Sequence, residues 1–487
     1  MPIFMAVVIL VSVSIFFGPC NASAQDVTPQ VLPDRIDDVP DAPGNPFPRF
    51  DNFSWRAFVA LNWPALDGAP NRGQPDRTKK LGDAGPRVWE TYKARYEVFA
   101  PGAPKPASWT SYDGTNPCGG AVTNQTKTLS AFSHFADFNQ AAFTLARLAN
   151  PLIDQSRMYS RYEVRFNREQ FDSIVDDNNK WYIKQNLPTA AKPGAFRDGS
   201  IELKAAWRVL KPNDGIDRSR YYIAKAMVFD LVATTRGGSI VCSERDIALV
   251  GLHIVIKTKL RPQWIWSSFE HIDNVPPKND EPDAKAAQVP YSFNSGSPPP
   301  GLAPTPAPKM ISDDNPPSDN PDPMQVVRLQ PIQPDTMQMN RAYWNLPEIK
   351  GTVWANYMLI MTQWPSAPGI PSPTNAGGPF PLGVGSTLAN TTMETYQQRN
   401  GSSCMECHQA VSNELGRDFV AFMALDAHDP AQQMLASAAF RRITAPLSAG
   451  ASAKTASRKT NQAVSPARTA LDNDPMVQAL ARVLQRR

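Results

Sequence analysis

Apolar positions recur along this chain with two different periods, and each period predicts a different kind of element. Residues 51–63 carry aromatic and aliphatic side chains at helical spacing, which predicts a short amphipathic helix. Residues 130–154 are apolar and rich in alanine, and the segment ends near an Asn-Pro pair, so it predicts a second helix. The remaining periodic segments have the period of a strand.

Strand patterns dominate the middle of the chain. Four segments are rich in β-branched and aromatic residues and are separated by Gly and Asp clusters, and a fifth follows later: residues 201–210, 221–233, 247–257, 263–272 and 353–363. Their short spacing favours an antiparallel sheet. The predicted fold class is therefore α+β, with a β-rich antiparallel scaffold.

The strand at 263–272 is dense in aromatic residues and holds one of the five histidines. Alternation divides its side chains between two faces, one with Trp264, Trp266, Ser268 and Glu270, the other with Ile265, Phe269 and His271. His253 lies on the preceding predicted strand. Such a cluster fits an ordinary sheet core as well as it fits a wall against a large apolar cofactor.

Polar, proline-rich stretches divide the chain into regions. Residues 274–324 are rich in Pro, Asp, Ser and Asn and cannot bury enough apolar surface to offset their ordering entropy, so we expect a mobile loop or linker. It separates a β-rich scaffold with N-terminal helices, residues 25–273, from a region at 325–444. Residues 445–487 form a basic tail that we expect to be largely disordered.

The first residues predict export. An apolar run over residues 3–17 precedes an Ala-Ser-Ala site at residues 22–24, which is typical of a cleaved signal peptide spanning 1–24, although no Lys or Arg precedes the run. The run is shorter than the ~20 residues of a membrane span. A retained anchor, or a lipoprotein beginning at Cys20, are the alternatives. No later segment is long and apolar enough to cross a membrane, and a net charge of +4 over 487 residues gives no argument for nucleic acid.

The strongest chemical signal is Cys404-Met405-Glu406-Cys407-His408. Covalent attachment of haem needs two thiols to add to its two vinyl groups, with the adjacent His beneath the iron as fifth ligand. Ser403 and Glu406 have the spacing of a capping box, which places the motif at a helix N-terminus. A structural zinc site would need two more Cys or His nearby, and a thioredoxin-like dithiol would need a βαβ setting.

Over residues 404–408 the chain resembles the haem-attachment site of bacterial c-type cytochromes. The resemblance implies one covalent haem c, with Cys404 and Cys407 as the thioether cysteines and His408 as the proximal iron ligand. It also implies periplasmic maturation, electron transfer and a periplasmic redox partner. The motif lies near the C-terminus here rather than early, which leaves the sixth ligand open. We expect residues 325–444 to form a cytochrome c-like haem-binding region, with a helical C-terminal segment that packs against the β scaffold.

The sixth iron ligand is not fixed by the motif. We rank His271 first, followed by Met423, Met393 and His253, with an open site as a further possibility; other side chains able to bind low-spin iron are His134, His428 and Met434. Residues 390–396, just upstream of the motif, could reach the haem propionates or begin a capped helix.

The two cysteines left over, Cys118 and Cys242, predict a disulfide in an oxidising compartment, with two buried free thiols as the alternative. Together these features predict a periplasmic electron-transfer protein. A haem oxidoreductase with an open or weakly filled sixth site, acting on a small substrate or peroxide, is one alternative. A partner-binding protein with a redox-sensing haem is another.

Overall fold

The computed structural model describes residues 27–34, 36–100, 102–112, 118, 128–129, 150–230, 241–277, 290–296, 308–309, 317–365, 383–384, 388–398, 403–405, 408, 416–420, 423 and 427. The predicted signal peptide, most of the predicted helix at 130–154, Cys407 and the basic tail lie outside these residues.

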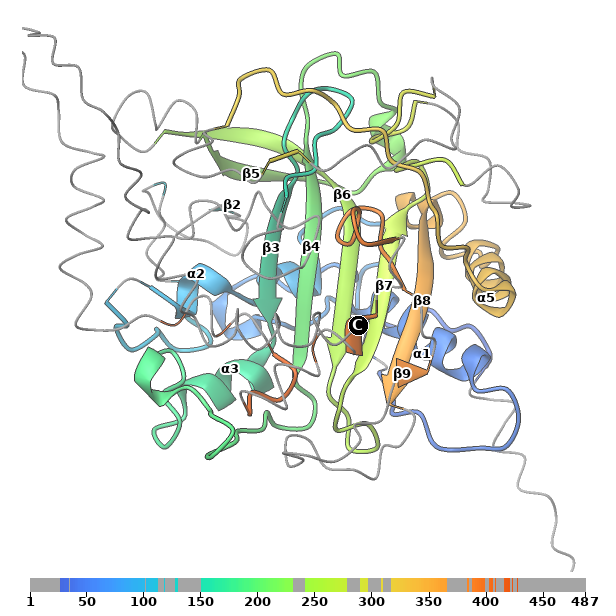
Figure 1. Cartoon of the computed structure of the whole chain (residues 1–487). Coiled ribbons are helices and arrows are strands. Elements are labelled where there is room, and N and C mark those ends of the chain that lie inside the picture. Colours follow the sequence, from blue (N-terminus) through green and yellow to red (C-terminus); the bar gives the residue numbers. More distant parts are fainter. Residues whose placement is uncertain are drawn as a thin grey trace, which may run out of the picture.

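One curled, mostly antiparallel sheet organises the described residues (Figure 1). Its main path runs β1 (Lys93–Ala94), β3 (Arg161–Phe166), β4 (Ile201–Val209), β6 (Cys242–Ile256), β7 (Ile265–His271), β8 (Tyr357–Pro365) and β9 (Gly383–Val384). β5 (Ile223–Phe229) also pairs with β6, and β2 (Thr128–Leu129) pairs with β5 in the one parallel ladder seen among the described strands.

Helices are short and few in the described part of the chain. They are α1 (Phe47–Leu61), α2 (Arg95–Val98), α3 (Arg168–Val175) and α5 (Pro334–Trp344), with 3₁₀ turns η1 (Ala69–Asn71), η2 (Val88–Thr91), η3 (Lys184–Asn186), η4 (Arg218–Arg220) and η6 (Val353–Asn356). Among these helices, none combines the length and the hydrophobicity of a membrane span.

The helix α1 covers one face of the sheet. Ser54 shares hydrogen bonds of 2.7 Å with Ser267 of β7 and with Thr362 of β8, and the Phe58 ring stacks on Phe269 at 4.3 Å. α1 also packs on α5, whose Asn340 donates to the Leu359 carbonyl of β8 at 2.9 Å. These contacts bury nearly every residue of α1, including its polar ones.

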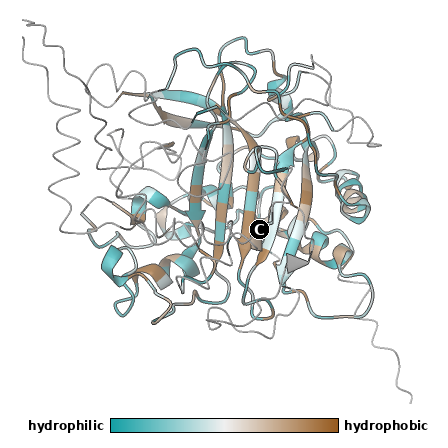
Figure 2. Ribbon diagram, in the orientation of Figure 1, coloured by the Kyte–Doolittle hydropathy of each residue, from teal (hydrophilic) through white to brown (hydrophobic). Residues whose placement is uncertain are grey.

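The described residues between 388 and 427 lie on the opposite face. Asn390 donates to the Ser268 hydroxyl (3.1 Å) and to the Phe269 carbonyl (2.9 Å). Thr392 lies over Gly251 of β6, where a Cβ would come within 2.3 Å of the Thr392 hydroxyl. With both faces covered, β6 is buried along most of its length from Ile247 onward, and Figure 2 shows it hydrophobic over much of that stretch while α5 is mostly hydrophilic.

The predicted α+β class and antiparallel sheet are confirmed, and the five predicted strands correspond to β4, β5, β6, β7 and β8. The predicted helix at 51–63 corresponds to α1. The helical character of the C-terminal segment stays a prediction: within residues 403–427, helical backbone is described at Cys404, Met405, His408 and Met423.

The structure differs from the predicted division into regions. β8 pairs with β7 over its length, so the regions 25–273 and 325–444 share one sheet. Part of the predicted linker also belongs to the core: Phe293 is fully buried, and it is hydrogen bonded through its backbone to Asn274 and Val326 (2.9 and 2.8 Å). One buried aromatic ring and paired backbone groups here outweigh a polar composition.

Candidate haem-attachment site

The start of the cysteine motif is anchored on strand β8. The Gln363 side chain exchanges hydrogen bonds with the Ser403 hydroxyl, and its Oε1 accepts the Met405 backbone N–H at 2.8 Å. A free N–H at a helix start needs such an acceptor. Gln363 therefore takes part in capping this turn, a role the sequence assigned to Ser403 and Glu406, of which Glu406 lies outside the described residues.

His408 lies on the sheet face that α1 leaves open. Its ring packs against Trp266 of β7, with centroids 4.5 Å apart, and its Nδ1 is 2.6 Å from the Phe419 carbonyl oxygen. A carbonyl can only accept, so Nδ1 carries the proton and Nε2 keeps its lone pair. Burial lowers the pKa of His408 to about 4, so the ring is neutral at neutral pH.

This arrangement fits a proximal haem ligand. A histidine that binds a metal through one nitrogen usually donates the other N–H to a carbonyl or carboxylate, which fixes the tautomer and the ring orientation. His408 has that hydrogen bond, and Cys404 lies one helical turn before it with a partly buried thiol. The fit rests on Cys404 and His408, because the placement of Cys407 is not described.

Three titratable groups lie close enough to His408 to influence its charge. Lys204 of β4 and His253 of β6 are directly opposite each other in the sheet, and Glu394 reaches them from the covering segment, with its Oε2 3.5 Å from His253 Nε2. Burial opposes ionisation of Glu394, but His253 and Lys204 outweigh it and hold the pKa of this carboxyl below its usual value. Burial also lowers the pKa of Lys204.

His271, the first-ranked sixth ligand, has a different environment. It is fully buried and stacks on Tyr221 at 3.8 Å, and its two ring nitrogens lie 3.1 Å from the Arg220 carbonyl and from the Asp273 backbone N–H. Both nitrogens are engaged, so ligation of iron through either one would break a hydrogen bond that the core already makes. The geometry gives His271 a structural role in the core.

The other candidates for the sixth iron ligand lie in different parts of the protein. Met393 is fully buried in the smaller hydrophobic cluster, and Met423 is fully buried in the main one. His253 shares the face of His408, and its Nε2 lies 3.5 Å from Glu394 Oε2. His134, His428 and Met434 lie outside the described residues.

Residues 390–396 make their described polar contacts with the protein itself. Glu270 of β7 accepts hydrogen bonds from the Thr391 hydroxyl and backbone N–H, and Thr395 donates to the Thr391 carbonyl. These contacts dock the segment on the sheet. They leave its predicted contact with haem propionates untested.

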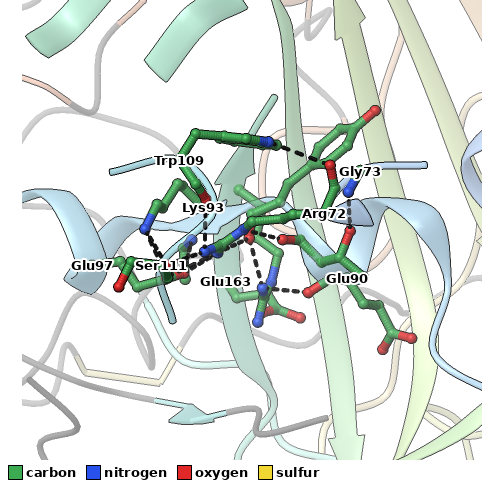
Figure 3. Close-up of polar contacts among 12 residues, drawn as sticks. Arg72, Gly73, Glu90, Lys93, Glu97, Trp109, Ser111 and Glu163 are labelled. Carbon is green, nitrogen blue, oxygen red and sulfur yellow. Dashed lines mark hydrogen bonds and ion pairs between the residues drawn. The ribbon is translucent and has the colours of Figure 1, made fainter. Parts of the chain in front are cut away.

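A second polar cluster lies at the β1–β3 edge and is shown in Figure 3. Arg72 is at its centre, with its guanidinium 2.8 Å from both carboxylate oxygens of Glu97 and 2.7 Å from the Ser111 carbonyl. Lys93 donates to the same carbonyl, and Trp109 donates to the Arg72 carbonyl. Since these charges are paired with one another, the cluster fastens the N-terminal region to the sheet and offers no open site.

Several residues of the haem-attachment site carry no signal in the sequence. The carbonyl of Phe419 acts through the backbone, so its residue type says nothing of its role. Gln363 and Lys204 come from strands 40 and 204 residues away from Ser403 and His408, respectively. The alternation along 263–272 did place Trp266 and Ser268 on the correct face.

No protein-family model, curated protein or solved structure matches this chain.

Proposed function

We propose that this chain is an exported c-type cytochrome that carries one covalent haem on Cys404 and Cys407, with His408 as proximal ligand, and transfers electrons to or from a periplasmic redox partner. The observation that carries the proposal is the hydrogen bond from His408 Nδ1 to the Phe419 carbonyl, which directs the Nε2 lone pair of a neutral imidazole away from the backbone.

When bound, the haem supplies one-electron chemistry. The chain's own part is to hold and shield it. Trp266 fixes one side of the His408 ring, and Gln363 and Met405 seat the motif against β8. Because His408 is neutral over the physiological pH range, no proton has to leave its Nε2 before ligation.

On the distal side, His253 becomes the first candidate in place of His271. Its Nε2 makes a long contact of 3.5 Å with Glu394 Oε2, while both nitrogens of His271 are engaged at 3.1 Å. Met423 and Met393 remain candidates.

The test is the mass of the full-length chain purified from a periplasm that can attach haem. We expect one haem per chain, retained under denaturing conditions, and loss of that haem when Cys404 and Cys407 are both replaced by Ser. The matched control removes the other two cysteines, Cys118→Ser with Cys242→Ser, and should keep the haem. A wild-type chain of apo mass contradicts the proposal.

A specific observation also favours a haem oxidoreductase as a second candidate. His253, Glu394 and Lys204 form a buried acid–base group near His408, and such groups serve proton transfer to a bound substrate. The visible spectrum separates the two functions. A low-spin spectrum that carbon monoxide leaves unchanged supports electron transfer, whereas a high-spin spectrum that changes with carbon monoxide supports the enzyme.

A further inference from the structure

The turn that presents the Phe419 carbonyl to His408 has an unusual backbone. Asp418 and Phe419 have φ angles of +47° and +66°, in the left-handed region, and neither is glycine. Non-glycine residues in this region persist when the surrounding structure determines their conformation, and they gather at functional sites. The contacts around residues 416–420 show what determines it here.

A fully buried carboxylate anchors the turn. Asp418 forms an ion pair with Lys257, just beyond the end of β6, at 2.9 Å, and it accepts the backbone N–H of Phe196 at 2.8 Å. The two side chains are 0% and 5% exposed. A buried charge pair of this kind keeps its geometry, because separating the partners would leave each buried charge without a partner or water to stabilise it.

The indole of Trp264 holds the same turn from a second direction. Its Nε1 donates to the Asp418 carbonyl at 3.1 Å, and Trp264 itself has a left-handed φ of +69° just before β7. Its ring also lies against the Lys257 ammonium, 5.8 Å away. The bonds from Lys257 and Trp264 therefore fix the peptide that immediately precedes Phe419.

Contacts of Gly416 hold the turn from a third direction. The Gly416 carbonyl accepts the Gly194 N–H at 3.0 Å, and a Cβ on Gly416 would come within 2.3 Å of the Thr189 carbonyl oxygen. Its φ of +65° likewise suits glycine. The turn is thus tied to the loop before β4, to the end of β6 and to the start of β7.

We infer that Asp418, Lys257 and Trp264 are positioning residues that set the reduction potential of the haem by holding the Phe419 carbonyl against His408 Nδ1. The inference rests on the proposed function. A strong hydrogen bond from Nδ1 makes the imidazole more basic and favours ferric iron, which lowers the potential. Loosening the turn weakens this bond and should raise the potential.

If these residues acted on the haem through their charges alone, the reduction potentials of the variants would shift in a different pattern, so mutation can test the inference. Asp418→Asn removes a negative charge, so electrostatics and positioning both predict a higher potential. Lys257→Met removes a positive charge, for which electrostatics alone predicts a lower potential and positioning predicts a higher one. Trp264→Phe changes no charge, keeps the ion pair, and should raise the potential by removing one hydrogen bond.

The experiment is a spectroelectrochemical redox titration of the full-length, haem-loaded protein and these variants. The control is Arg208→Met, which breaks an equally buried pair with Asp154 (1% exposed on both sides) that has no contact with the turn. It should lower the melting temperature and leave the potential unchanged. If Lys257→Met does not fold, Trp264→Phe carries the test.

A positive shift in Lys257→Met and Trp264→Phe, absent in Arg208→Met, supports the inference. A negative or absent shift in Lys257→Met or in Trp264→Phe, with haem still attached, overturns the inference and leaves the proposed function standing. A wild-type chain without covalent haem overturns both.

Discussion

Asp51 is a carboxyl that the fold holds away from water. It lies on α1 and is fully buried, and it accepts hydrogen bonds of 2.7 Å from the hydroxyls of Thr336 and Thr362. Burial raises the pKa of Asp51 to about 7, and the two threonine hydroxyls only partly oppose this shift. The carboxyl is consequently protonated in mildly acidic solution and pays a desolvation cost when it ionises.

The stability of the protein should therefore fall as pH rises through this range. In the unfolded chain Asp51 ionises near pH 4, and in the folded chain near pH 7, so its contribution is present below pH 4 and is lost by about pH 7. Asp51→Asn removes this titration. Relative to the variant, wild type should lose about 2–3 kcal/mol of unfolding free energy between pH 5 and 8.

Urea unfolding of both proteins at several pH values measures this difference. Asp335, which is close to Asp51 in space, offers the control, and Asp335→Asn should leave most of the pH dependence in place. Parallel curves for wild type and Asp51→Asn would show that Asp51 is already ionised at pH 5.

At the level of single residues, sequence reasoning succeeded where the signal is local. The spacing of Cys404 and His408 is compact, and the leftover cysteines are few, so Cys118 and Cys242 could be paired by counting, and the structure joins them. His271 was ranked first as a ligand because its strand is aromatic. Its engagement with Arg220 depends on a loop 51 residues away, which no local pattern reports.

Among the elements, β3 alternates charged with apolar residues, a pattern typical of a half-buried strand. All six of its residues are buried, including Arg161, Glu163 and Arg165. Arg165 pairs with Glu163 at 2.8 Å, and Glu163 accepts the Trp207 indole N–H at 2.8 Å. A charged strand can lie inside the protein here because Arg165 and Glu163 pair with each other, and carbonyl and indole groups of other segments complete their hydrogen bonds.

At the neighbouring β1–β3 edge of the sheet, Glu97 is the buried carboxylate that pairs with both Arg72 and Lys93. Burial alone would raise its pKa, but Arg72 and Lys93 outweigh burial and hold the pKa of Glu97 below its usual value. Glu97→Gln leaves two buried cations without their carboxylate, so we expect a loss of about 3–5 kcal/mol in unfolding free energy at pH 7.

The pH dependence has a definite sign. A depressed folded-state pKa gives stability that is present above the unfolded pKa near 4.5 and is lost as pH falls through the lower folded value. The difference between wild type and Glu97→Gln should therefore shrink in acid. Glu244→Gln, which breaks an exposed pair with Lys225, is the control and should change stability by less than about 1 kcal/mol. An equal loss in both variants would contradict the buried network.

Strands with long β-branched and aromatic runs were predictable, and a strand whose burial depends on tertiary contacts was not. β4 to β8 could be located from such runs, but β3, in which charged and apolar residues alternate, was not assigned bounds. The composition of residues 274–324 suggested a linker, yet Phe293 is core. In both cases the deciding partners are far away in sequence, which a window of ten residues cannot contain.

On the scale of the whole molecule, other segments pack on both faces of the sheet. The N-terminal helix α1 packs on one face, and residues 388–398 pack on the other, where Figure 1 shows an orange loop in front of β6 and β7. The haem motif thus lies on a broad, rigid surface. On this surface Trp266 packs against His408, and Lys204 and His253 lie close enough to influence the charge of the His408 ring.

A disulfide joins two segments of the scaffold that are far apart in sequence. Cys118 is bonded to Cys242 at the start of β6, with Cα atoms 5.7 Å apart and a sequence separation of 124. Closing so long a loop restricts the unfolded chain, which in the chain-entropy model stabilises the folded state by up to about 4–5 kcal/mol. The link lies in the scaffold and does not involve the haem motif.

Removing it should therefore weaken the fold and spare the cofactor. We expect Cys118→Ser with Cys242→Ser to lower the urea midpoint, with the covalent haem still attached in full. Dithiothreitol should lower the midpoint of wild type in the same way and have no effect on the variant, because it reduces a disulfide but does not cleave a thioether. Thiols at both positions that alkylate in native, unreduced protein would refute the link, and a midpoint unchanged by its removal would show that the sheet closes this loop without it.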